Sequence, residues 1–514
     1  MLAKIYSAAV HGIDALPVTV EVLADKGTTF TIVGLPDMAV KESYQRILSA
    51  MQQSGMIFPH CRLVINLSPA DVKKEGAAFD LPMALGILAA NENISAEAMA
   101  DCMVTGELSL DGSLLPVKGV LPMAIKAREM GFKRMIVPEA NATEAAVVNN
   151  VEVYGMSSLE QTVAFLNGLK PVEPTIVDTR EQFRLQADNF DFDFSEVKGQ
   201  FAVKRALEVA CAGGHNILMV GSPGSGKSML SKRIPSILPP LSLSEALETT
   251  KIHSVAGKLG RGSMLMTSRP FRAPHHTVSP VALVGGGTTP QPGEISLAHN
   301  GVLFLDEFPE FPRAVLEVLR QPVEDRVITV SRAKYTVDYP ASFMLVASMN
   351  PCPCGWYGHP KKACTCMPGA VSRYMNRISG PLLDRIDLQI EISPVEFDEM
   401  ADNVPAESSE AIRKRVVEAR NIQLRRFANE PFIHCNAQMN TRQIRQYAWP
   451  DEEGLKRLKN AMERHSMSAR AFDRILKVAR TIADLDGRES VNAGHIAEAI
   501  GYRNLDRASY GQTF

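Results

Sequence analysis

Apolar and polar positions change their pattern along the chain, and these changes divide it into regions. Residues 1–168 mix short β-rich apolar runs with runs of helical period, which is typical of a mixed α/β region. Strands are expected at residues 18–23, 28–33 and 61–67, and helices at 38–53, 82–90 and 118–130. The first region is therefore expected to fold as an α+β domain.

The rest of the chain shows three further patterns. Residues 169–193 have no sustained period, and their prolines and acidic residues are typical of a linker. Residues 194–394 alternate between strand, loop and helix, which predicts an α/β domain. Residues 395–514 have a helical pattern. Helices are expected there at 408–427, 441–448, 451–465, 468–484 and 492–500.

Composition limits the possible settings of the protein. The 514 residues suffice for about three domains, and the net charge of −2 means that any DNA contact needs a local basic lining. The longest plain apolar run, residues 81–90, is too short to span a bilayer, and the first residues lack the apolar core of a signal peptide. We therefore expect a cytoplasmic protein with no membrane partner. Its eight cysteines should be reduced thiols or metal ligands.

The sequence GSPGSGKS at residues 221–228 matches the pattern G-x-x-x-x-G-K-[ST] in full. It follows an apolar strand and precedes a helix expected over residues 227–238, so backbone N–H groups and the helix N-terminus can surround a polyphosphate. Lys227 would neutralise the β and γ phosphates of ATP, and Ser228 would bind Mg²⁺. The nucleotide-binding residues are expected to be Gly221, Ser222, Pro223, Gly224, Ser225, Gly226, Lys227 and Ser228.

Two more apolar strands end in polar residues that suit ATP hydrolysis. The strand at 301–305 leads into Asp306, expected to hold Mg²⁺, and Glu307, expected to orient and deprotonate the attacking water. The strand at 343–349 leads into Asn350, whose amide would hold that water as a sensor; a simple turn residue is the alternative. Together with the phosphate loop, these residues predict an ATPase.

Arginines further along the chain could complete the pocket. Arg385 is the candidate arginine finger for the γ phosphate of a neighbouring subunit, with a local ion pair to its flanking aspartates as the alternative. Arg470 is the candidate second sensor, and Arg373 and Arg377 compete for both roles. Because a finger that acts in trans requires a ring, we expect a homo-hexamer.

Four cysteines gather within fifteen residues, with the spacing C-x-C…C-x-C. Four thiolates suit a closed, tetrahedral zinc site, which would fix a loop too short to have its own core. Reduced cysteines without metal in a turn are the alternative, and His359 could replace one thiol. The candidate zinc ligands are Cys352, Cys354, Cys364 and Cys366.

The order of these motifs resembles the AAA+ ATPases and, more narrowly, their magnesium-chelatase/MCM branch. That resemblance implies that inserts line a central pore and contact DNA. The corresponding segments here contain His275 and His276, and a predicted β-hairpin over residues 327–337 with Arg332 and Lys334. Structural packing is the alternative role for the two histidines.

Almost the whole chain resembles the YifB/ComM family of magnesium-chelatase-like ATPases. The motifs that carry this resemblance are GTTFTIVGLPD at 27–37, NLSPA at 66–70, GGHN at 213–216 and NPCPCG at 350–355. It implies a Lon-protease-like first domain with the fold of ribosomal S5 domain 2 (residues 1–168), an AAA+ core (194–394) and a C-terminal helical lid (395–514).

Residues 104–117 are similar to the proteolytic domain of Lon, which needs a serine nucleophile and a lysine. In this chain Ala78 stands at the serine position, and the lysine position falls near Leu121. Ser68 and Lys118 are nearby in the sequence, but neither fits the pattern. We therefore interpret the first domain as an inactive scaffold.

The family resemblance implies a hexameric motor that hydrolyses ATP with Mg²⁺ and moves single-stranded or branched DNA through its pore. Branch migration during recombination and natural transformation is the implied role, with recombination proteins as partners. A chelatase-like or chaperone-like ATPase that remodels a protein partner is the alternative.

Overall fold

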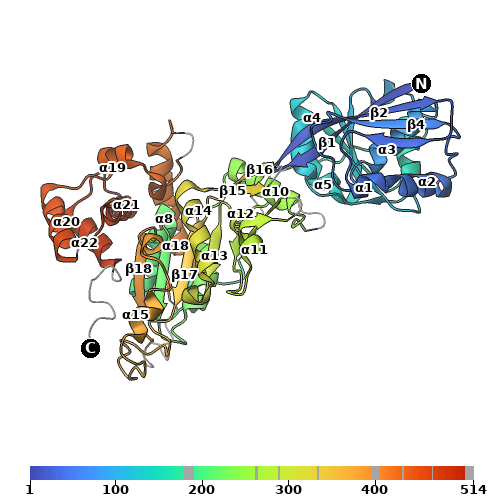
Figure 1. Cartoon of the computed structure of the whole chain (residues 1–514). Helices are drawn as coiled ribbons and strands as arrows, with labels where there is room; N and C mark the ends of the chain where they lie inside the picture. The colour runs from blue at the N-terminus through green and yellow to red at the C-terminus, as the bar shows by residue number, and fades with distance from the viewer. Residues whose placement is uncertain are drawn as a thin grey trace. The chain divides into compact units, whose positions relative to one another are not determined.

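The computed structural model describes residues 1–95, 97–178, 190–260, 264–287, 290–332, 335–395, 406–430, 433–465 and 467–503. The chain forms two compact units, each described by itself below (Figure 1). The first unit contains Met1–Gln186, Leu243–Thr267 and Pro290–Pro292, and the second contains Ala187–Ser242, Ser268–Thr289 and Gly293–Phe514. The mixed α/β class predicted from the sequence is confirmed.

A seven-stranded mixed sheet forms the centre of the first unit, in the order β3-β4-β2-β1-β5-β8-β9. Its two longest strands, β1 and β2, are antiparallel, with Ile5 opposite Val20, and both of these side chains are fully buried. The strands are β1 (Leu2–His11), β2 (Asp14–Asp25), β3 (Phe30–Val33), β4 (Arg62–Ser68), β5 (Cys102–Val104), β8 (Arg134–Pro138) and β9 (Glu152–Met156).

Helices cover this sheet. Every residue of α3 (Asp80–Ala90) is buried, because its sequence is apolar on all sides and it packs on β1 and β2. At its first turn, the buried carboxylate of Asp80 accepts hydrogen bonds from Arg46 Nε at 2.6 Å and Nη2 at 2.9 Å. The other helices are α1 (Met38–Lys41), α2 (Ser43–Gln53), α4 (Val120–Glu129), α5 (Ala142–Ala145) and α6 (Leu159–Leu166).

One helix of the first unit comes from the middle of the sequence. Helix α10 (Leu243–Val255) packs on α4, where Gly119 N–H donates to Ser254 O at 3.2 Å and the Ser254 hydroxyl donates to Glu144. Lys251 of the same helix forms an ion pair with Asp14. From the sequence these residues were predicted to belong to the region 194–394, whereas their long-range contacts group them with the first unit.

The second unit is built on a five-stranded sheet in the order β11-β14-β17-β10-β18, in which all neighbouring strands are parallel. Its central strands are buried apolar runs, as expected for a parallel sheet covered on both faces. Consequently, the loops that follow β10, β14 and β17 all lie at the same edge of the sheet. The strands are β10 (Ile217–Gly221), β11 (Phe271–Arg272), β14 (Val302–Leu305), β17 (Met344–Met349) and β18 (Leu388–Ile392).

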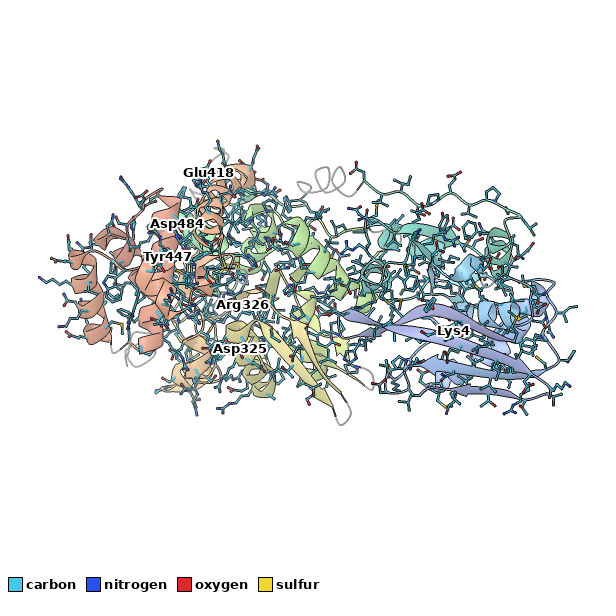
Figure 2. The ribbon with its side chains drawn as sticks, turned by 90° about the horizontal axis from the view of Figure 1, so that it is seen from above. Lys4, Asp325, Arg326, Glu418, Tyr447 and Asp484 are labelled. Carbon is cyan, nitrogen blue, oxygen red and sulfur yellow. The ribbon has the colours of Figure 1, made fainter. Side chains whose placement is uncertain are left out.

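A separate antiparallel hairpin is formed by β15 (Val327–Arg332) and β16 (Tyr335–Pro340), with Val330 opposite Val337. The predicted hairpin is therefore present. Arg326 lies at its base (Figure 2). Its Nη1 donates to Ser342 Oγ at 3.1 Å. Lys334 and the side chain of Arg332 lie outside the described part of the chain.

The C-terminal helices of the second unit begin and end within one residue of the predicted positions. Side chains of Ser408, Asn440, Ser468 and Asn492 cap their N-termini, which is why local sequence identifies the starts. The helices are α18 (Ser409–Arg426), α19 (Thr441–Tyr447), α20 (Glu452–His465), α21 (Ala469–Leu485) and α22 (Ala493–Gly501).

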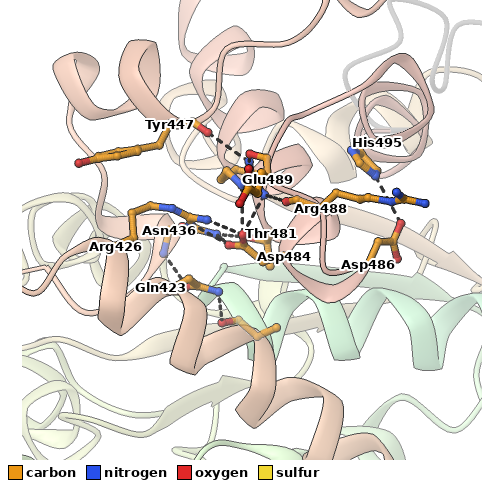
Figure 3. Close-up of polar contacts among 12 residues, drawn as sticks. Gln423, Arg426, Asn436, Tyr447, Thr481, Asp484, Asp486, Arg488, Glu489 and His495 are labelled. Atoms are coloured by element: carbon orange, nitrogen blue, oxygen red, sulfur yellow. Dashed lines mark hydrogen bonds and ion pairs between the residues drawn. The ribbon is translucent and has the colours of Figure 1, made fainter.

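A buried polar network holds these helices together (Figure 3). Asp484 accepts from Arg426 Nη2 at 2.5 Å and from Asn436 Nδ2 at 2.8 Å, and Arg480 Nη2 lies 2.9 Å from the same carboxylate. The side chain of Asp484 is fully buried, so these donors compensate the cost of removing its charge from water. The network fixes α18 against α21.

A second buried cluster joins α21 to the central sheet. His215, two residues before β10, lies with Nε2 2.7 Å from Thr481 Oγ1. The carboxylate of Asp387 accepts from Arg474 Nη1 at 3.1 Å. The backbone N–H of Asn216 donates to Asp387 Oδ2 at 2.8 Å. Burial lowers the pKa of His215 to about 4, although Asp387 opposes that shift.

This cluster predicts a dependence of stability on pH. The unfolded chain protonates His215 near pH 6.5 while the folded chain resists protonation down to about pH 4, so stability is present above pH 6.5 and is lost on acidification. The loss should approach about 1.4 kcal/mol per pH unit within that window. In thermal unfolding between pH 7.5 and 5, His215→Gln should be less stable at pH 7.5 but should show a shallower acid slope.

The control for this prediction is His60→Gln, because His60 is exposed in the first unit. It should leave both the stability at pH 7.5 and the slope unchanged. An unchanged slope in His215→Gln would contradict the assignment of the acid dependence to this buried ring.

No helix in the described ranges is long and apolar enough to cross a membrane.

Candidate active site

The phosphate loop connects β10 to α9 (Lys227–Ile237) at the carboxyl edge of the parallel sheet. Gly226 has a φ of +89°, a left-handed conformation that glycine adopts at little cost, and it directly precedes the helix. The ammonium of Lys227 lies inside the loop and donates to Gly221 O at 2.7 Å and to Ser222 O at 3.0 Å. Burial lowers the pKa of Lys227, while the nearby carboxylates oppose the shift.

Asn350, directly after β17, lies on the other side of this ammonium. Its Oδ1 accepts a hydrogen bond from Lys227 Nζ at 3.2 Å. The phosphate loop and the predicted sensor are therefore in direct contact, although Lys227 and Asn350 are 123 residues apart in the chain.

Asp306, directly after β14, is held by two hydroxyl groups. Ser228 Oγ donates to Asp306 Oδ2 at 2.6 Å, and Ser348 Oγ donates to Oδ1. Ser348 was not predicted as a site residue. It lies in β17 two positions before Asn350, and side chains two apart in extended backbone point to the same face.

Glu307 differs from Asp306 in that its side chain is 57% exposed. Its backbone has a φ of +54°, and its N–H donates to Asp306 Oδ1 at 3.0 Å. Its carboxylate lies 3.2 Å from Nδ1 of His276, whose ring is tilted against that of His275 with centroids 4.1 Å apart. The structure thus places His276 beside the predicted catalytic base, a position that its sequence context did not indicate.

The four cysteines that follow Asn350 converge. All four Sγ atoms lie within 4.8 Å of one another, with 3.3 Å between Cys352 and Cys354 and 3.5 Å between Cys354 and Cys364. Cys352 is buried, and Cys354, Cys364 and Cys366 are half-buried. This arrangement of soft donors could hold a metal ion.

Comparisons with known proteins agree with this architecture. Residues 193–400 match the family described as magnesium chelatase, subunit ChlI, residues 19–141 match subunit ChlI of Mg-chelatase, and residues 406–503 match its C-terminal family. The chain is 42% identical to the competence protein ComM of Haemophilus influenzae over 98% of both chains. It is 42% identical to YifB of Escherichia coli, again over 98% of both.

The chain belongs to the YifB/ComM family of magnesium-chelatase-like ATPases.

ATP and Mg²⁺ are the ligands that this AAA+ family implies, and the residues present fit them. The phosphate loop offers backbone N–H groups, the ammonium of Lys227 and the buried Ser225 Oγ, which has no hydrogen-bond partner among the described residues. Ser228 and Asp306 provide a hydroxyl and a carboxylate in contact, which are the ligand types that Mg²⁺ accepts from proteins.

The predicted arginines occupy different environments. Arg385 has a side chain that is only 13% exposed, donates from Nη1 to Pro381 O at 2.8 Å and forms an ion pair with Glu324. Arg377 contacts Glu310 at 2.8 Å, and Arg373 is exposed. The role of Arg385 as a finger stays a prediction.

Arg470 is exposed at the start of α21. One turn later on the same helix, Arg474 pairs with Asp387 and connects the helix to the base of β18. Arg474 was not predicted from the sequence, because its partner is 87 residues away in the chain. The role of Arg470 as a second sensor stays a prediction.

This YifB/ComM-family protein also has partial similarity to Lon proteases. The chain is 30% identical to the archaeal Lon protease of Thermococcus kodakarensis over 93 residues, which is 17% of this chain and 14% of that protein. Ala78 contributes its carbonyl to a hydrogen bond from Gly106 N–H at 2.9 Å, and Leu121 is fully buried. Neither position provides the nucleophile or base that peptide hydrolysis needs.

Ser348 gives a testable prediction for this site. Ser348→Ala removes the hydroxyl that orients Asp306, so the Mg²⁺ concentration needed for half-maximal ATP hydrolysis should rise by about 3–10-fold. Ser296→Ala is the matched control, because Ser296 is also fully buried but its hydroxyl has no partner among the described residues. Equal Mg²⁺ dependence in both variants would contradict a role for Ser348 in holding Asp306.

Proposed function

We propose that this protein is a ring-forming motor that hydrolyses ATP to move branched or single-stranded DNA during the integration of incoming strands. Two observations support the proposal. Four residues predicted for ATP binding and hydrolysis, Lys227, Ser228, Asp306 and Asn350, meet at one sheet edge. The chain is also similar over 98% of its length to a protein named for competence.

Within each subunit, Lys227 would bind the phosphates, and Asp306 with Ser228 would hold the metal. Bound Mg²⁺ would supply charge stabilisation for the phosphoryl group that is transferred. Glu307 would accept the proton of the attacking water. Because its carboxylate lies beside His276, it must leave that contact to reach the water, so His276 would hold Glu307 in a resting position.

The proposed ring would be a homo-hexamer in which Arg385 reaches the pocket of the neighbouring subunit. In the described conformation Arg385 pairs with Glu324, which stands at the end of α14 (Arg320–Asp325), directly before the β15–β16 hairpin. Transfer of Arg385 to a neighbouring phosphate would release Glu324. This exchange would connect nucleotide state in one pocket to the position of a hairpin that contacts DNA.

A remodelling ATPase with a protein client is the second candidate, because the matched families are described as chelatase subunits. The net charge of −2 favours neither candidate, since DNA contact would depend on a local basic lining. We place the protein in the cytoplasm in both cases. The two candidates differ in what stimulates ATP turnover.

The deciding experiment measures ATP turnover with no DNA, with single strands and with a four-way junction. DNA should stimulate turnover several-fold, and the stimulation should weaken as salt is raised. Glu307→Gln should reduce turnover by about 10²–10⁴-fold under every condition. Glu317→Gln is the control, because within the described part of the chain Glu317 forms an ion pair with Arg320 three residues away. ATP turnover that no DNA substrate stimulates would contradict the proposal of a DNA motor and would favour a protein client.

A further inference from the structure

The four-cysteine loop begins where the sensor strand ends. Only Pro351 separates Asn350 from Cys352, so the first cysteine is tied through the backbone to the residue that contacts Lys227. Cys352 is fully buried and accepts a hydrogen bond from Tyr357 N–H at 3.3 Å. The loop therefore has a fixed starting point within the nucleotide site.

The spacing of the sulfur atoms suits a tetrahedral metal. Metal–sulfur bonds of about 2.3 Å in a tetrahedron place the sulfurs about 3.8 Å apart. Three pairs of Sγ atoms here are separated by 3.3, 3.7 and 3.5 Å, and all four lie within 4.8 Å of one another. Four thiolates select soft divalent cations such as Zn²⁺ and exclude Mg²⁺.

The same loop packs directly on the phosphate loop. Gly355 has a φ of +83°, and a Cβ placed on it would lie 2.6 Å from Pro223 Cδ and 2.7 Å from Cγ. Only glycine permits this approach between the two loops. Gly358, three residues later, has a similar φ of +73° but would meet nothing within 4 Å.

We propose that a thiophilic divalent cation bound by Cys352, Cys354, Cys364 and Cys366 clamps the phosphate loop, so that metal loading sets the affinity for nucleotide. This inference rests on the proposed ATPase function. Without the ion, a loop with few apolar residues would lose the crosslink that holds Gly355 against Pro223 and steadies Asn350. Metal binding would thereby order both sides of the Lys227 ammonium.

The test compares two samples of the full-length protein. One is loaded with zinc, and the other has been stripped of zinc by a chelator that is then removed by dialysis. Bound zinc is measured by elemental analysis, and ATP affinity is measured by equilibrium binding with saturating Mg²⁺. We expect one zinc per chain and an ATP Kd that rises by about tenfold or more when zinc is removed. Co²⁺ in place of Zn²⁺ should give the absorption bands of tetrahedral thiolate coordination.

Two glycine variants distinguish an effect of the proposed clamp on ATP binding from effects on folding or on metal binding. Gly355→Ala should retain one zinc per chain but weaken ATP binding by about tenfold, because its Cβ displaces Pro223. Gly358→Ala carries similar backbone strain without that contact and should bind both zinc and ATP normally. Cys354→Ser with Cys364→Ser should lose zinc and ATP affinity together, whereas Cys61→Ser should lose neither.

The outcomes distinguish this inference from the proposed function. ATP binding that is identical with and without zinc would overturn the clamp while leaving the ATPase intact. Absence of zinc from the purified wild-type protein, and failure to take it up, would also overturn the clamp. Zinc-loaded wild-type protein that binds no ATP would contradict the ATPase itself.

Discussion

The parallel direction of the five central strands is the constraint on which the candidate site depends. Carboxyl ends of neighbouring parallel strands meet at one edge, so residues that follow β10, β14 and β17 come together although they are far apart in the chain. Lys227, Asp306 and Asn350 occupy these positions. The sheet and the phosphate loop after β10 therefore bring a cation, a carboxylate and an amide to one place.

Buried polar contacts extend this arrangement into the helices. Asn216 is central, because its side-chain Oδ1 accepts from Leu345 N–H at 2.8 Å in β17 and its backbone N–H donates to Asp387. Asp387 in turn pairs with Arg474 of α21. A movement of the C-terminal helices therefore has a hydrogen-bonded path to the strand that carries the phosphate loop. This explains physically why the GGHN segment at 213–216 precedes the loop.

Local sequence predicted the helices and strands better than it predicted which residues contact each other across the fold. The C-terminal helices matched within one residue, because helical period and capping side chains are local properties. The phosphate loop and the two strand ends were recognisable because their motifs are also short, local stretches of sequence. The placement of α10 in the first unit, the contact of His276 with Glu307 and the pair between Arg474 and Asp387 depend on long-range folding. Ser348 was missed, although its position two residues before Asn350 in β17 was a local signal that could have identified it.

The central claim is that the loop around Lys227 binds the phosphates of ATP. Equilibrium binding of ATP with Mg²⁺ to the wild-type protein and to Lys227→Ala tests it most directly. Lys232→Ala is the matched control, because Lys232 lies on the same helix but is exposed. We predict that Lys227→Ala weakens ATP binding by about 10–100-fold and that Lys232→Ala leaves it unchanged. Equal affinity in all three proteins would contradict the claim.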